Sequence, residues 1–285
     1  MLRKLIKYDI KAVAPIWLLM AAVVACMSVF GSVVGRLSIE AVENPDNYTL
    51  LCVFGMLLAF LCAMVVVSSP LVTTFLVYWR FYKNFYTDEG YLTFTLPVSR
   101  RQLMLSKVVN ALIWTTAHGI LLALCLLIAC LIVPPTFGEG VFNTVVFDGI
   151  GEGIRAIWKF GGAWTILWAL EALVGLLVAT LFSIGCFHLC ITIGAVVAKK
   201  AKLLAAIGIY YLSGMVISTA SQLFTTLILP LLTPGLGVLL RDVTAGQGFG
   251  VVSLIAAIVI AVFAAVACVV HFITVGMVER KLNLP

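Results

Sequence analysis

The sequence predicts an all-α membrane protein that crosses the bilayer six times. Hydrophobic residues make up 63% of the 285-residue chain and charged residues only 11%, whereas about a quarter of a soluble domain is charged. Six apolar stretches are long enough to form helices that cross a hydrocarbon core of about 30 Å. They cover 15–34, 50–78, 108–133, 163–198, 203–232 and 251–277. Because these stretches are continuous rather than alternating, helices are favoured over a β-barrel, and residues 1–285 are expected to form one transmembrane domain.

The distribution of Lys and Arg predicts the orientation, since basic residues gather in the cytoplasmic loops of membrane proteins. With the N-terminus inside, 14 of the 18 basic residues fall on the cytoplasmic side. We therefore expect a multi-pass protein of the plasma membrane with both termini in the cytoplasm. This asymmetry also accounts for the net charge of +6, so a nucleic-acid partner is not needed to explain it.

Residues 1–13 are predicted to form an amphipathic helix at the inner membrane surface. Apolar side chains recur there at helical spacing, and the basic ones lie mainly between them. The apolar set is Leu2, Leu5, Ile6, Ile10 and Val13, and the basic set is Arg3, Lys4, Lys7 and Lys11. The alternative is a basic flank that only sets the orientation of the first span.

The second span is interrupted by Ser68, Ser69 and Pro70. Proline removes a backbone donor and bends a helix, so this span is expected to be kinked. Its inner end carries an aromatic cluster of the kind that lies at the head-group level of a membrane. The cluster comprises Tyr78, Trp79, Phe81, Tyr82, Phe85 and Tyr86.

The outer connection, 134–160, starts with two prolines and contains several glycines, which argues against one regular element. Its last part is different, because four apolar residues follow the spacing i, i+4, i+7, i+8 and indicate a short helix on the outer surface. These residues are Ile150, Ile154, Ile157 and Trp158.

Glu171 is the one acidic residue inside a predicted span, and an ionisable group in that position suggests substrate or proton handling. The preferred alternative is structural. Glu171 lies about eight residues, or roughly 12 Å, from the outer end of its span, where snorkelling or pairing with Arg155 or Lys159 would satisfy the carboxylate.

The fifth span is polar along one side, which favours either a water-filled path or contact with another helix. The polar set, at i, i+3, i+4 and i+7, is Ser218, Ser221, Gln222 and Thr225. Gly214 and Ser218 add a small-xxx-small pair that suits helix contact. Between the fifth and sixth spans, prolines and glycines break an apolar run, which predicts a re-entrant segment.

Motifs for catalysis or metal binding are missing from the sequence. It contains no phosphate-binding GxxxxGK[ST], HExxH or GxSxG pattern, so the chain is not expected to be an enzyme. Cys186 and Cys190 share a helix face, but His188 points about 200° away, which excludes three-ligand chelation of a metal. The isolated His118 and His271 are interpreted as packing residues.

The longest polar interruption is 80–107, RFYKNFYTDEGYLTFTLPVSRRQLMLSK. Asp88, Glu89 and Gly90 are placed to start a short amphipathic turn, which Pro97 ends. Its apolar face consists of Tyr91, Leu92, Phe94 and Leu96. Ser99 then forms the N-cap of the next helix, with Gln102 at the capping-box position. A compact element of this kind between two spans is interpreted as a docking surface for a partner.

With DEGYLTFTLPVSRRQLMLSK at its centre, this stretch resembles the type 2 ABC transporter permeases, in particular bacterial six-span subunits whose ATPase is encoded separately. The order of elements is similar as well. In that family an interfacial helix precedes six spans, a coupling helix lies between spans two and three, and re-entrant helices lie between spans five and six.

The resemblance implies an exporter with two permease subunits, identical or related, and two ATPase subunits that bind ATP and Mg, while this chain binds no cofactor. It implies that 88–95 dock into the ATPase and that spans two and five line the translocation path. The docking residues would be Asp88, Glu89, Gly90, Tyr91, Leu92, Phe94 and Thr95. The path residues would be Ser69, Thr73, Ser218, Gln222 and Thr225.

Two other functions are weighed against this one. An ion-coupled secondary transporter often has inverted repeats around an intramembrane charge. The two halves of this chain show no such repeat, and Glu171 is the only clear candidate for the charge. An intramembrane enzyme would need paired catalytic groups, which the spans lack. Apolar spans with scattered Ser, Thr and Gln suit a hydrophobic or amphipathic substrate such as a peptide, drug or lipid.

Overall fold

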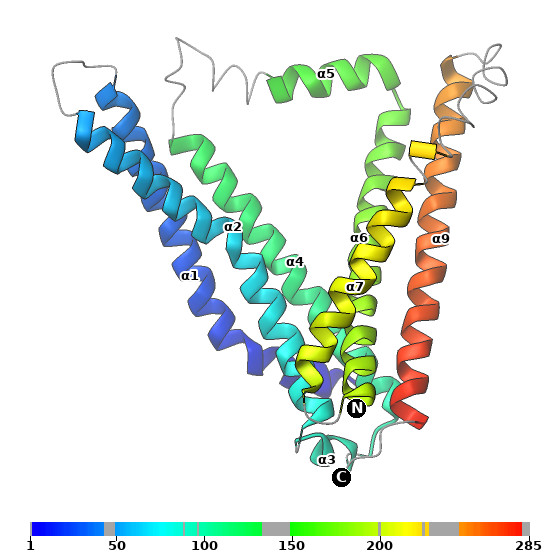
Figure 1. Ribbon diagram of the computed structural model, residues 1–285. Helices are drawn as coiled ribbons and strands as arrows, with labels where there is room; N and C mark the ends of the chain where they lie inside the picture. Colours follow the sequence, from blue (N-terminus) through cyan, green and yellow to red (C-terminus); the bar gives the residue numbers. More distant parts are fainter. Residues whose placement is uncertain are drawn as a thin grey trace. The chain divides into compact units, whose positions relative to one another are not determined.

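The computed structural model describes residues 2–42, 49–87, 89–95, 97–132, 149–198, 201–223, 226–227 and 245–280, and within them it contains no strand (Figure 1). The helices are α1 (Leu2–Val42), α2 (Thr49–Tyr86), α3 (Glu89–Phe94), α4 (Arg100–Ile132), α5 (Gly149–Gly161), α6 (Trp164–Val197), α7 (Lys202–Leu223) and α9 (Ala245–Arg280). Six helices, all but α3 and α5, are long and apolar enough to cross a membrane. The predicted all-α fold is thereby confirmed for the described residues, with six helices that could cross a membrane.

Some predicted features lie outside the described residues. They are the re-entrant segment between the last two spans, most of the outer connection, and the individual residues Asp88, Leu96 and Thr225.

Contacts divide the chain into two compact units, a division that the sequence did not predict. Unit 1 consists of Met1–Trp79 and Val109–Phe160, and unit 2 consists of Arg80–Val108 and Gly161–Pro285. Helices α2 and α4 therefore contribute one part to each unit.

In unit 1, α1 packs against both α2 and α4. The α-carbon of Gly31 lies so close to α2 that an added Cβ would be 2.6 Å from the Cβ of Cys62. On the other side the hydroxyl of Ser28 donates to the carbonyl oxygen of Cys125 at 3.1 Å. Trp17 and Trp114 pack with ring centroids 4.9 Å apart. A small residue therefore brings α1 close to α2, while large rings fill the contact with α4.

Helix α1 is continuous from Leu2 to Val42, so the prediction of a separate interfacial helix over 1–13 was wrong in its boundaries. Its amphipathic pattern is present, because all four basic residues of that segment are exposed and its five apolar residues are buried or partly buried. Pro15 lies inside α1, and Figure 1 shows the first turns running at an angle to the rest. At the other end, α1 continues past the apolar run to Val42, and this part carries an ion pair between Arg36 and Glu40.

The predicted short helix before the fourth span is present as α5. Its apolar side chains Ile154, Ile157 and Trp158 are all more than half exposed. An amphipathic helix whose apolar face is uncovered suits a membrane surface, which is the position that the sequence predicts for it.

In unit 2, α6 packs against α7 and α9. An added Cβ on Gly194 would lie 2.6 Å from the backbone nitrogen of Ala206, so α7 meets α6 in backbone contact. Along α9, successive contacts pair Gly175 with Ile260 and Gly185 with Val270. Because both residue numbers rise together, α6 and α9 run in the same direction, as Figure 1 also shows.

Candidate functional site

The end of α2 runs parallel to α6 within unit 2. Phe81 packs on the ring of His188 at a centroid distance of 4.1 Å, and one helical turn later the hydroxyl of Tyr86 lies 2.6 Å from that of Thr192. The C-terminal ends of α2, α6 and α9 therefore point the same way. The last carbonyls of each helix have no partner within the helix and carry partial negative charge. Lys83 in the last turn of α2 and Arg100 beside the end of α9 bring positive charge to two of these ends.

The sequence predicts that the whole aromatic cluster of 78–86 lies at the head-group level, but only part of it is exposed enough to do so. Phe81, Phe85 and Tyr86 are almost completely buried, with 2%, 0% and 5% of their surface exposed. They fill the space between the end of α2, α3 and α6. Half of the predicted cluster is therefore a packed core that supports the following helix.

Gly90 fixes the position of α3 on this core. An added Cβ would lie 2.9 Å from the carbonyl oxygen of Phe85 and 3.1 Å from its carbonyl carbon. Both are backbone atoms, which cannot move aside as a side chain can. The amide of Gly90 also donates to the carbonyl of Thr87 at 2.8 Å, so the chain turns tightly from α2 into α3.

The inner side of α3 is completed by Phe94. Its ring meets Phe85 edge to face at 5.5 Å, and the guanidinium of Arg100 lies 5.1 Å above its centroid. Gly90 and Phe94, both predicted to contact a partner, therefore face the rest of unit 2. They hold the helix in place.

The outer side of α3 presents apolar side chains. Tyr91 is 65% exposed and Leu92 is 68% exposed, and Thr95 is exposed beside them. Glu89 pairs with Lys83 at 2.7 Å, with about half of each side chain exposed, so that pair adds at most about 1 kcal/mol to stability. We define the docking face as Glu89, Tyr91, Leu92 and Thr95.

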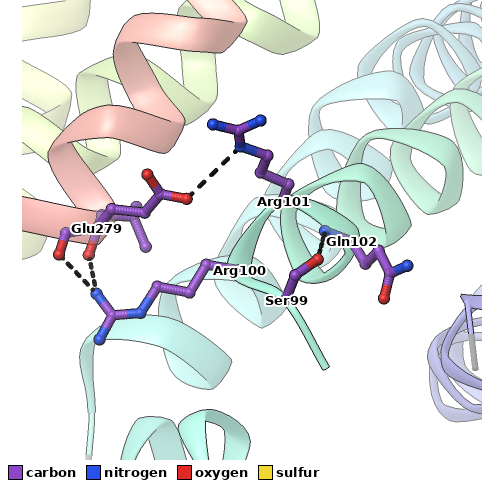
Figure 2. Close-up of polar contacts among 6 residues, drawn as sticks. Ser99, Arg100, Arg101, Gln102 and Glu279 are labelled. Atoms are coloured by element: carbon purple, nitrogen blue, oxygen red, sulfur yellow. Dashed lines mark hydrogen bonds and ion pairs between the residues drawn. The ribbon is translucent and has the colours of Figure 1, made fainter. Parts of the chain in front are cut away.

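Helix α4 begins with the predicted cap. The backbone N–H of Gln102 donates to the hydroxyl of Ser99 at 3.4 Å, as Figure 2 shows. The N–H of Leu103 donates to the carbonyl of Ser99 at 3.1 Å. The sequence therefore located this helix start correctly, and α4 continues through the third span.

Arg100 joins the start of α4 to the end of α9. Its guanidinium donates to the carbonyl oxygens of Val278 at 2.7 Å and Glu279 at 3.0 Å (Figure 2). Neighbouring Arg101 is 3.7 Å from the Glu279 carboxylate and is 74% exposed. Hydrogen bonds to a charged group contribute about 1.5–3 kcal/mol, whereas an exposed pair at this distance contributes about 0–1 kcal/mol, so Arg100 dominates this junction.

Sequence reasoning missed this role of Arg100 and missed Thr192 and Glu279 entirely. One signal was available. Arg100 is the first residue of α4, where a positive charge opposes the helix dipole. A cation in that position suggests that it serves another group, which proves to be the C-terminal end of α9.

Of the predicted path residues, Ser69 and Thr73 lie in unit 1 and are each 3% exposed. Both contact His118, with Ser69 Oγ 3.1 Å from Nε2 and Thr73 Oγ1 3.0 Å from Nδ1. Ser218 and Gln222 lie in unit 2 and are exposed. His118 thus packs between two hydroxyl groups, which agrees with its interpretation as a packing residue.

Pro70 determines the direction of these hydrogen bonds. It lacks the N–H that would bond to the carbonyl of Val66 in a regular helix, and the hydroxyl of Ser69 donates to that carbonyl instead at 2.6 Å. Having given its single proton, Ser69 can only accept from Nε2–H of His118. A neutral His118 therefore presents an unprotonated Nδ1, which accepts the proton of the Thr73 hydroxyl at 3.0 Å in preference to Met20 Sδ, a weaker acceptor 3.6 Å away.

Glu171 is satisfied differently from the prediction. Its carboxylate accepts a hydrogen bond from the hydroxyl of Ser253 on α9. Ser253 lies 82 residues further along the chain and was not singled out by sequence reasoning. The pairing belongs to the packed contact between α6 and α9.

A scan against protein-family models and searches of curated proteins and solved structures found no match to this chain.

Proposed function

We propose that this chain is the membrane-spanning permease subunit of an ATP-driven exporter, and that the docking face of α3 binds a separate ATPase subunit. The observation that carries the proposal is the pair of exposed apolar side chains, Tyr91 and Leu92, on a short helix that lies between two candidate spans. Exposed apolar groups outside a membrane mark a surface for a partner.

The construction of α3 supports a partner of defined shape. A six-residue helix is too short to be stable alone, and here Gly90 and Phe94 fix it to the core of unit 2. Tyr91 and Leu92 are consequently held outward on a rigid support. Pre-organised apolar anchors of this kind reduce the entropy lost on binding.

The contacts of α3 also suggest how a movement of the ATPase would reach the spans. Phe94 contacts Arg100, and Arg100 holds the last carbonyls of α9. Through Tyr86, the same region bonds to Thr192 of α6. A displacement of α3 would therefore act on α6 and α9 together, because side chains that are packed or hydrogen-bonded move as a group.

In this proposal the partner subunit binds ATP and Mg, and a second permease subunit, identical or related, completes the exporter. The chain lies in the plasma membrane with both termini in the cytoplasm, which places α3 where an ATPase can reach it. The exported substrate is a hydrophobic or amphipathic molecule.

A pull-down with matched variants tests the docking face. The tagged chain is purified from its native host in mild detergent, and ATP hydrolysis by the co-purified material is measured. We expect the double variant Tyr91→Ala, Leu92→Ala to lose at least tenfold of this activity, because two apolar anchors contribute about 1–2 kcal/mol or more each. Tyr211→Ala with Leu212→Ala is the control, since these residues on α7 are equally exposed, at 68% and 69%.

Two outcomes would contradict the proposal. One is an unchanged amount of co-purified ATPase in the Tyr91, Leu92 variant when its expression and thermal unfolding match the wild type. The other is transport by the chain alone in liposomes with an ion gradient and no ATP, which would favour the secondary transporter.

A further inference from the structure

Glu171 lies where a carboxylate is costly. It follows Trp164, the first residue of α6, by seven positions, or about 10 Å of helix, and α6 is one of the candidate membrane spans. The side chain is only partly buried, between exposed Leu167 and Val174 one turn away on either side. A charged group there needs a cation, a proton or several hydrogen bonds.

The described part of the chain supplies few of the partners that a charged carboxylate needs in this position. The hydrogen bond from Ser253 to Oε1 is the one polar contact that the described residues make with the carboxylate. Ser253 itself is buried, with 6% of its surface exposed. The carboxylate is thus held in a fixed position on one side and open on the other.

Two aromatic residues precede Glu171 along the same contact between α6 and α9. Trp164 and Trp168 precede Glu171 at i, i+4 and i+7 spacing, which places all three on one face of α6. Trp168 meets Phe249 edge to face at 5.3 Å, and the ring of Trp164 packs on Gly250. The face of an indole ring attracts cations, so two such rings on the helix face of Glu171 favour a positively charged ligand over an anion.

We propose that Glu171, held by Ser253 and preceded on the same helix face by Trp164 and Trp168, binds the cationic group of an organic monocation whose apolar body lies along the exposed face of α6. The inference rests on the proposed function and specifies its substrate class as cationic and amphipathic. Leu167, Leu170 and Val174, at 40%, 54% and 50% exposed, supply the apolar surface for the body of the molecule.

Binding to the isolated chain tests this inference without the ATPase. Radiolabelled tetraphenylphosphonium is equilibrated with the purified chain in dodecyl maltoside, and protein-free micelles are subtracted. We expect saturable binding of one cation per chain and at least a tenfold loss of affinity in Glu171→Gln, which keeps an acceptor for Ser253. Glu152→Gln removes an exposed carboxylate on α5, outside the candidate spans, and should leave the affinity unchanged.

Several results would overturn the inference. Equal competition by tetraphenylborate, an anion of the same size and shape, would show that charge is not recognised. Unchanged affinity in Glu171→Gln, with thermal unfolding like that of the wild type, would show that the carboxylate does not bind the cation and has only a structural role. Displacement of the probe by phosphatidylethanolamine but not by phosphatidylglycerol would assign the site to a resident lipid.

The two proposals fail separately. Loss of ATPase co-purification in the docking-face variant bears on the partner and does not depend on the cation. Conversely, absence of cation binding would reject the substrate class while leaving the ATPase-dependent exporter intact.

Discussion

The guanidinium of Arg100 lies 2.7 Å from the carbonyl oxygen of Val278, a residue 178 positions later in the chain. The last four carbonyls of a helix have no partner within it. In α9 the charged guanidinium of Arg100 donates hydrogen bonds to two of them. The same guanidinium covers the ring of Phe94. One side chain therefore connects the short helix α3 with the end of the last span.

This connection predicts a large difference between two adjacent arginines. Arg100→Gln should weaken the last turn of α9 by about 2 kcal/mol, because it removes charged hydrogen bonds and a cation–π contact. Hydrogen exchange of amides 276–280 should then accelerate by about tenfold or more. Arg101→Gln, the matched control, should change exchange very little, since its ion pair is exposed. Equal effects of the two substitutions would contradict the assignment.

Gly90 gives a second prediction, because its neighbours are backbone atoms. Gly90→Ala should displace α3 and cost about 1–3 kcal/mol, as expected for overpacking, even though alanine favours helix formation. The measurement is hydrogen exchange within 89–95. Gly208→Ala is the control, since nothing lies within 4 Å of an added Cβ at that position. If α3 retains its wild-type protection in Gly90→Ala, the close contact with Phe85 does not fix the helix.

The third prediction concerns the proton on His118. The hydrogen-bond directions around Pro70 require the Nε2–H tautomer, which solid-state NMR of ¹⁵N-labelled histidine identifies by its two ring-nitrogen shifts. A His118→Gln sample locates the signal among the three histidines. Pro70→Ala restores the N–H that bonds to Val66, so the hydroxyl of Ser69 becomes free to donate and a mixture of tautomers is expected.

Pro15→Ala is the matched control for this experiment, because it also removes a proline from a helix but leaves the surroundings of Pro70 unchanged. It should not alter the His118 signal. Observation of the Nδ1–H tautomer in the wild-type chain would contradict the hydrogen-bond assignment.

The features that sequence reasoning predicted correctly depend on local physics. The hydroxyl of Ser99 caps a helix that starts at the next residue, so a four-residue pattern was enough to find it. The apolar spacing around Ile154 and Ile157 likewise defines α5 without reference to any other element. The six candidate spans follow from length and hydropathy alone, although α1 continues beyond its apolar stretch to Val42.

The features that it missed depend on contacts between distant parts of the chain. Arg100 and Arg101 are indistinguishable as neighbouring basic residues, and only the position of α9 separates their roles. Phe81 belongs to an aromatic cluster that, from sequence alone, is expected at the head-group level of the membrane. It is buried instead, because α6 brings His188 against its ring. The sequence favours pairing of Glu171 with Arg155 or Lys159, whereas its carboxylate contacts Ser253 on α9, 82 residues further along the chain.

The bond from Arg100 to Val278 also sets an order for biosynthesis. A ribosome adds about 5–20 residues per second, so roughly 10–40 s pass between the synthesis of Arg100 and that of the carbonyls to which it binds. Until α9 has been inserted, Arg100 lacks these acceptors and the support beneath α3 is incomplete. A partner that requires a firmly held α3 would consequently bind finished chains and ignore truncated ones.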